Sequence, residues 1–84
     1  MYNIYYNDNV NESNMIYAAK TLDEAKSWIK SELKGHTLVD ESSQCSDDVF
    51  GSSKVARYEV YDGDPIVDGE FKDAVYASDY FYND

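Results

Sequence analysis

The segment from Thr21 to Gly35 restricts the fold of this 84-residue chain more than any other part of the sequence. Thr21 and Glu24 have the spacing of a capping box, in which the hydroxyl accepts from one amide and the carboxylate reaches back to another. We therefore expect a helix over residues 22–34, ended by Gly35. Its apolar residues fall on one stripe at helical spacing: Leu22, Ala25, Trp28, Ile29 and Leu33. Such a stripe must be buried against another element.

Alternating apolar and polar residues predict strands before and after this helix in the sequence. Residues 2–7 alternate, and a polar, turn-forming stretch leads into a second short strand over residues 15–19, so the two are expected to form a hairpin. Residues 54–62 alternate again and predict a central strand. After two turns rich in Asp and Gly, a last strand is expected over residues 70–78.

These elements predict a single small acidic domain over residues 1–84, of the α+β class. We expect one amphipathic helix packed on a small antiparallel sheet of three to five strands, in a ββαββ-like order. Residues 40–53 are rich in Ser and Asp and predict a mobile loop. Two strand orders stay open, because this loop allows the third strand to join either edge of the first hairpin.

The net charge of −10 is unevenly distributed and restricts the class of partner. Residues 40–84 hold twelve Asp and Glu against three Lys and Arg, whereas residues 1–39 hold five acids against four lysines. A field of negative charge disfavours direct binding to DNA, RNA or an anionic membrane. Because 43% of the residues are hydrophobic, the acids are expected on a folded scaffold rather than a disordered tail. The composition favours a basic protein partner.

Location and redox state follow from what the chain contains. No apolar run approaches the roughly 18 residues that span a bilayer, and the first residues lack the pattern of an export signal. Cys45 is the only cysteine, so no internal disulfide can form, which is typical of a reducing compartment. We expect a cytoplasmic protein.

Catalytic and metal-binding patterns are nearly absent. The chain has one histidine and one cysteine, no phosphate-binding glycine loop and no zinc-ligand spacing, so neither enzymatic activity nor a cofactor is expected. The acids between Asp62 and Glu70 also fail the calcium-loop pattern of an EF-hand, which requires glycine where Val67 stands. No metal site is predicted.

The acids of the last two strands and their turns are the candidate site. Carboxylates two residues apart on one strand face are spaced by about 6.6 Å, so these acids are expected to form an array over one surface. Tyrosines among them are expected to be rigid anchors, because interface energy concentrates in aromatic residues. The predicted partner-binding residues are Glu59, Tyr61, Asp62, Asp64, Asp68, Glu70, Asp73, Asp79, Tyr80 and Tyr82.

In size, acidity and expected helix-on-sheet architecture, the chain resembles the small acidic proteins with which phages and mobile elements disarm host defence, including anti-CRISPR and anti-restriction DNA mimics. The resemblance rests on class rather than on a motif. It implies a noncatalytic inhibitor that occupies a basic site on a nucleic-acid-binding protein. The alternative is a small bacterial or phage accessory domain of structural or regulatory role, which self-associates as a homodimer and whose acidity serves solubility.

Overall fold

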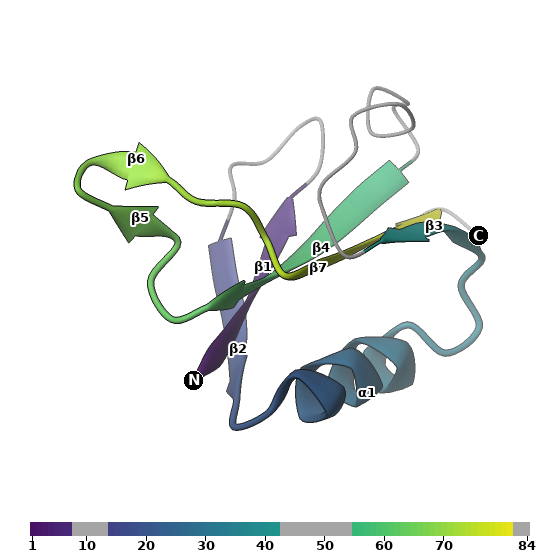
Figure 1. Cartoon of the computed structure of the whole chain (residues 1–84). Coiled ribbons are helices and arrows are strands. Elements are labelled where there is room, and N and C mark those ends of the chain that lie inside the picture. The colour runs from purple at the N-terminus through teal and green to yellow at the C-terminus, as the bar shows by residue number, and fades with distance from the viewer. Residues whose placement is uncertain (8–13, 43–54, 82–84) are drawn as a thin grey trace.

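The computed structural model describes residues 1–7, 14–42 and 55–81, which form an α+β fold with one helix on one face of a sheet (Figure 1). The main sheet is antiparallel, has five strands and runs in the order β2-β1-β4-β7-β3. A separate two-stranded hairpin, β5-β6, projects beyond it. The elements are β1 (Tyr2–Asn7), β2 (Asn14–Ala19), α1 (Leu22–Glu32), β3 (Leu38–Ser42), β4 (Val55–Asp62), β5 (Ile66–Val67), β6 (Glu70–Phe71) and β7 (Tyr76–Phe81).

Helix α1 begins where its capping sequence predicts. The Glu24 amide donates to the Thr21 hydroxyl at 3.1 Å, so the first half of the capping box is confirmed. The Glu24 carboxylate reaches one residue further back than expected, because it accepts from the amide of Lys20 at 3.3 Å. The last helical residue is Glu32, two residues before the predicted end, and Gly35 follows with a φ of 97°.

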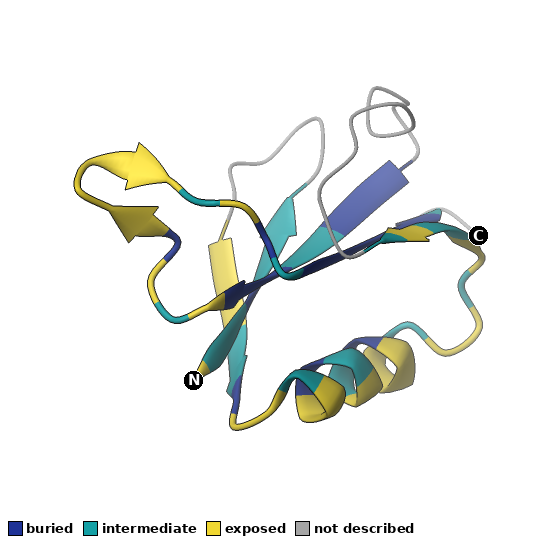
Figure 2. Ribbon diagram, in the orientation of Figure 1, coloured by how far each residue is buried: buried dark blue, intermediate teal, exposed yellow. Residues whose placement is uncertain are grey.

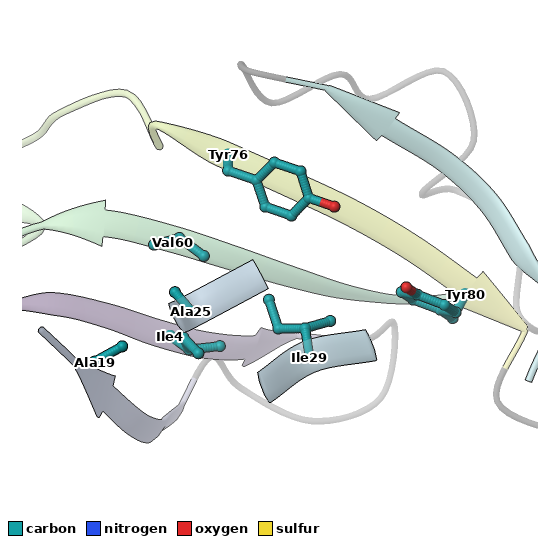
Figure 3. Packing of buried hydrophobic residues seen from close by; sticks show 7 residues of the cluster. All are labelled: Ile4, Ala19, Ala25, Ile29, Val60, Tyr76 and Tyr80. Carbon is teal, nitrogen blue, oxygen red and sulfur yellow. The ribbon is translucent and has the colours of Figure 1, made fainter. Parts of the chain in front are cut away.

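The core lies between α1 and the face of the sheet that α1 covers. Figure 3 shows side chains from α1, β1, β2, β4 and β7 converging in one cluster. The buried members of this cluster are Ile4, Ala19, Ala25, Ile29, Val60, Tyr76 and Tyr80. Full burial of Ile29 alone contributes about 1.5–3 kcal/mol to stability. At the flank of the helix, the ring of Trp28 stacks on Tyr17 with centroids 4.6 Å apart.

The sheet settles the strand order that the sequence left open. Strand β4 is central as predicted, and pairs with β1 on one side and β7 on the other. The ββαββ-like order is too simple, because the sheet uses five strands and the β5-β6 hairpin is inserted between β4 and β7. The single last strand predicted over residues 70–78 is also wrong. Residues 70–71 belong to the hairpin, and β7 starts only at Tyr76.

Strand β3 replaces the start of the predicted loop at residues 40–53. Asp40, Glu41 and Ser42 pair with β7 at an edge of the sheet, and Glu41 accepts a hydrogen bond from the Tyr76 hydroxyl at 3.1 Å. Their polar side chains suit an edge strand, because one long edge of such a strand is open to solvent. Residues 43–53 of the predicted loop, including Cys45, lie outside the described residues.

Candidate functional site

The β5-β6 hairpin is built by turn residues that fix its conformation. Asp68 and Gly69 connect the two strands with φ values of 54° and 82°, the positive pair that a tight two-residue hairpin turn requires. At the entry, the Asp64 carboxylate accepts from the Ile66 amide at 3.0 Å and closes a local turn. The hairpin register follows directly, with Ile66 opposite Phe71 and Val67 opposite Glu70.

Hydrogen bonds also fasten the base of this hairpin to the sheet. The Lys72 amide donates to the Pro65 carbonyl at 2.9 Å and closes the stem of the hairpin, while the Lys72 ammonium donates to the carbonyl of Asp62, the last residue of β4. Across to β1, the Asn3 side-chain amide donates to the Gly63 carbonyl at 2.7 Å. The hairpin is therefore held from both of its ends, and a partner that binds it has less conformational entropy to remove.

The hairpin exposes apolar side chains that a folded domain normally buries. Phe71 is 75% exposed, Val67 51% and Ile66 46%, and Figure 2 shows strands β5 and β6 as an exposed projection beyond the mostly buried strands β4 and β7. An exposed aromatic ring on a preorganised element is the kind of residue that concentrates binding energy in protein interfaces.

Acidic residues surround these apolar side chains. Five acids between residues 62 and 73 are exposed: Asp62, Asp64, Asp68, Glu70 and Asp73. Lys72 is the one basic residue in this stretch, and its ammonium points to the base of the hairpin, where it bonds the Asp62 carbonyl. Five carboxylates and one ammonium leave a net charge of −4 on twelve residues. We call residues 62–73 the acidic hairpin.

A pocket of about 260 Å³ lies where the acidic hairpin meets the sheet face that α1 does not cover. Its six lining residues are Tyr5, Tyr61, Asp64, Pro65, Ile66 and Phe71. The rings of Tyr5 and Tyr61 meet edge to face at 86° with centroids 5.5 Å apart. Tyr61 and Pro65 are buried and form the inner part, whereas Asp64 and Phe71 are exposed at the rim.

Glu59 extends the negative charge toward this pocket. It lies directly opposite Tyr5 in the register of β4 and β1, and it accepts from the Tyr61 hydroxyl at 3.3 Å. Of the predicted site residues, Glu59 and Tyr61 therefore lie beside the acidic hairpin in space as well as in sequence. They extend the candidate site from the hairpin onto the sheet.

Three predicted partner-binding residues are buried instead: Asp79, Tyr80 and, at 8% exposure in the wall of the pocket, Tyr61. Asp79 is 3% exposed and forms an ion pair with Arg57, which is also 3% exposed, with Nε and Oδ1 2.8 Å apart. A second hydrogen bond joins the Arg57 Nη2 and Asp79 Oδ2 atoms at 3.1 Å. The array prediction placed Asp79 at an outer position because alternation alone does not reveal that both faces of β7 are covered.

Tyr80, the second of these residues, lies in the core under α1 with 5% exposure, so it is not a surface anchor. Burial, with a smaller contribution from the charge of Glu41, raises the pKa of its hydroxyl. Tyr82 lies outside the described residues.

Sequence reasoning missed Tyr5 and Phe71 as members of the candidate site. A signal for Tyr5 was present, because it falls on the opposite side of the first strand from Ile4 and had no assigned partner. Phe71 was assigned to the last strand predicted over residues 70–78, which hid its place in the projecting hairpin. The site therefore combines an acidic segment that the sequence revealed with an aromatic pocket that it did not.

Comparison with known proteins and a search for metal-binding clusters do not assign a function to this site. Neither a family model, nor a curated protein, nor a solved structure matches this chain. Within residues 1–7, 14–42 and 55–81, no three His, Cys, Asp or Glu side chains are grouped so that they could hold a metal ion. In the same part of the chain, no helix has both the length and the apolar character needed to cross a membrane.

Proposed function

We propose that this protein is a noncatalytic binder whose acidic hairpin occupies a basic site on a nucleic-acid-binding protein. The observation that carries this proposal is the placement of five exposed carboxylates, with a net charge of −4, on a preorganised projection. Helix α1 lies well away from this projection, so the hairpin can enter a groove without displacing the core (Figure 1).

The partner class follows from charge and from shape. Grooves that accept phosphates are lined with Lys and Arg, and such a groove also accepts suitably spaced carboxylates. Carboxylates steer the encounter, while exposed apolar residues such as Phe71 contribute to the lifetime of the complex. The protein would then act as a stoichiometric inhibitor of nucleic-acid binding, as a DNA mimic does.

The test compares two variants that lose the same charge in different places. The hairpin pair is Asp68→Asn with Glu70→Gln, and the helix pair is Asp23→Asn with Glu32→Gln. All four positions are exposed, and each pair removes one Asp and one Glu charge. Proteins from a cell extract of the source organism are captured on the immobilised chain and eluted by rising salt. Duplex DNA is then added to the captured complex.

We expect the captured proteins to be basic, to elute below about 0.5 M salt and to be displaced by duplex DNA. The hairpin pair should weaken capture at least fivefold, whereas the helix pair should change it by less than twofold. Equal weakening by both pairs would show that only the net charge matters. Binding that is insensitive to salt, or unaffected by DNA, would contradict the proposal.

A second candidate function is self-association, which the exposed apolar residues favour. Ile66, Val67 and Phe71 on the hairpin, and Met15 and Ile16 on edge strand β2, are each at least 41% exposed. Two copies could bury these residues against each other. Sedimentation equilibrium distinguishes the two candidates: a tight dimer that Phe71→Ala dissociates would support self-association, and a monomer at micromolar concentration would exclude it.

A further inference from the structure

We infer that the pocket between the acidic hairpin and the sheet takes one arginine side chain from the basic partner. This inference rests on the proposed function, because it names the group by which the partner is recognised. It depends on the chemistry of the pocket wall and not on the overall charge of the hairpin. The two ideas can therefore fail separately.

The size and shape of the pocket suit one long side chain. Its volume of about 260 Å³ is below the range of about 300–1,000 Å³ that is usual for drug-sized ligands. Tyr61 and Pro65 provide a buried apolar inner surface for an aliphatic stem, and exposed Phe71 at the rim provides a further ring. An aliphatic stem with a polar end matches this gradient from apolar interior to charged rim.

The polar end that fits is a cation. Three aromatic rings, those of Tyr5, Tyr61 and Phe71, line the pocket, and the face of an aromatic ring attracts a cation. The Asp64 carboxylate lines the same pocket and is oriented by its bond from the Ile66 amide, yet a carboxylate keeps further lone pairs for another donor. Glu59, which accepts from the Tyr61 hydroxyl, adds a second negative charge nearby.

Arginine fits this wall better than lysine. Its guanidinium is planar, stacks on an aromatic ring and offers paired donors to one carboxylate, whereas the lysine ammonium is a compact and more strongly hydrated point charge. A pocket that is lined by aromatic rings and one oriented carboxylate therefore favours arginine. Arginine is also common in the phosphate-binding grooves that the proposed function requires.

The first experiment measures this preference without any partner. The full chain is titrated at constant ionic strength with Nα-acetyl-arginine amide, with Nα-acetyl-lysine amide and with the neutral Nα-acetyl-citrulline amide, and ¹H-¹³C spectra of the aromatic rings are recorded. We expect saturable shifts of the Tyr5, Tyr61 and Phe71 signals with arginine, with a dissociation constant on the order of 1–10 mM. The lysine probe should bind at least threefold more weakly, and the citrulline probe should give no saturable shift. Equal shifts with the citrulline and arginine probes, or no shift with arginine, would overturn the inference.

A matched pair of variants separates the pocket from the general acidity. Asp64→Asn removes the pocket charge but keeps an oxygen that can accept from the Ile66 amide. Asp68→Asn removes the same charge at the hairpin tip, where asparagine tolerates the positive φ. We expect Asp64→Asn to weaken binding of the arginine probe about fivefold and Asp68→Asn by less than twofold. Equal effects would show that no specific contact is made at Asp64.

Phe71→Ala tests the aromatic wall at a position that does not threaten folding, because this ring is 75% exposed. We expect a two- to fivefold loss of arginine binding, and Phe71→Tyr, which keeps a ring, should retain it. Arginine binding that survives Phe71→Ala unchanged would overturn the cation–π part of the inference. If the arginine probe binds but the hairpin pair leaves partner capture intact, the proposed function fails and the pocket assignment stands. If the hairpin pair weakens partner capture but the arginine probe does not bind, only the pocket assignment fails.

Discussion

Replacing Asp79 by asparagine should destabilise the fold strongly, although the sequence first suggested that Asp79 binds a partner. Both side chains of its ion pair with Arg57 are 4% exposed, and two hydrogen bonds of 2.8 and 3.1 Å join them. The substitution would leave an uncharged amide against a buried guanidinium. Removing one member of a buried ion pair costs about 3–5 kcal/mol. A domain of 84 residues has a total stability of roughly 4–13 kcal/mol, so this loss is a large fraction of it.

The free energy of unfolding is measured by urea denaturation, followed through the fluorescence of Trp28, the only tryptophan. Asp73→Asn is the control, because Asp73 is exposed and loses the same charge. The control should change stability by less than about 0.5 kcal/mol. A double variant, Arg57→Met with Asp79→Leu, should recover most of the loss by removing both charges together. A loss of less than about 1 kcal/mol in the free energy of unfolding for Asp79→Asn would refute the claim that this buried ion pair is needed for a stable fold.

Three further predictions test local features. Thr21→Ala should lower the free energy of unfolding by about 1 kcal/mol in urea denaturation, while Thr21→Ser, which keeps the capping hydroxyl, should not. Gly69→Ala should strain the hairpin turn by about 1–2 kcal/mol, speed hydrogen exchange in residues 66–71 and lower the urea midpoint, because hydrogen bonds hold the hairpin to the sheet; unchanged exchange in residues 66–71 would contradict the role of Gly69. Burial, then the Glu41 carboxylate, raises the pKa of Tyr76 to about 12, so the neutral phenol stabilises the fold fully below pH 10 and this contribution is lost as the pH rises from 10 to 12. Tyr76→Phe should therefore flatten the fall in stability over that range, and an unchanged pH profile would contradict it.

Local sequence signals predicted the helix and the central strand well. The capping residue Thr21 and the apolar stripe needed no information from elsewhere in the chain. Residues 40–42 of strand β3 were assigned to a loop because Asp40, Glu41 and Ser42 have weak strand preference. They are held by pairing with β7, and by the bond from Tyr76 to Glu41 across 35 positions of sequence. Tertiary pairing decided their structure.

The candidate site was only half predictable for a related reason. The acids of residues 62–73 were apparent from composition and turn residues, because exposed turns are encoded locally. The burial of Asp79 depends on Arg57, 22 positions away, and on the burial of β7 on both of its faces. One hint was available, since β4 carries Val55 and Tyr61 on the face opposite Val60, which is typical of a strand buried on both sides.

The most direct test of the central claim is hydrogen–deuterium exchange of the complex with a captured partner. If the acidic hairpin is the binding site, amides of residues 62–73 should exchange more slowly in the complex than in the free chain. The amides of α1 (Leu22–Glu32), which lies away from the hairpin, should exchange at the same rate in both. Protection over α1 with no change in residues 62–73 would contradict the proposed site.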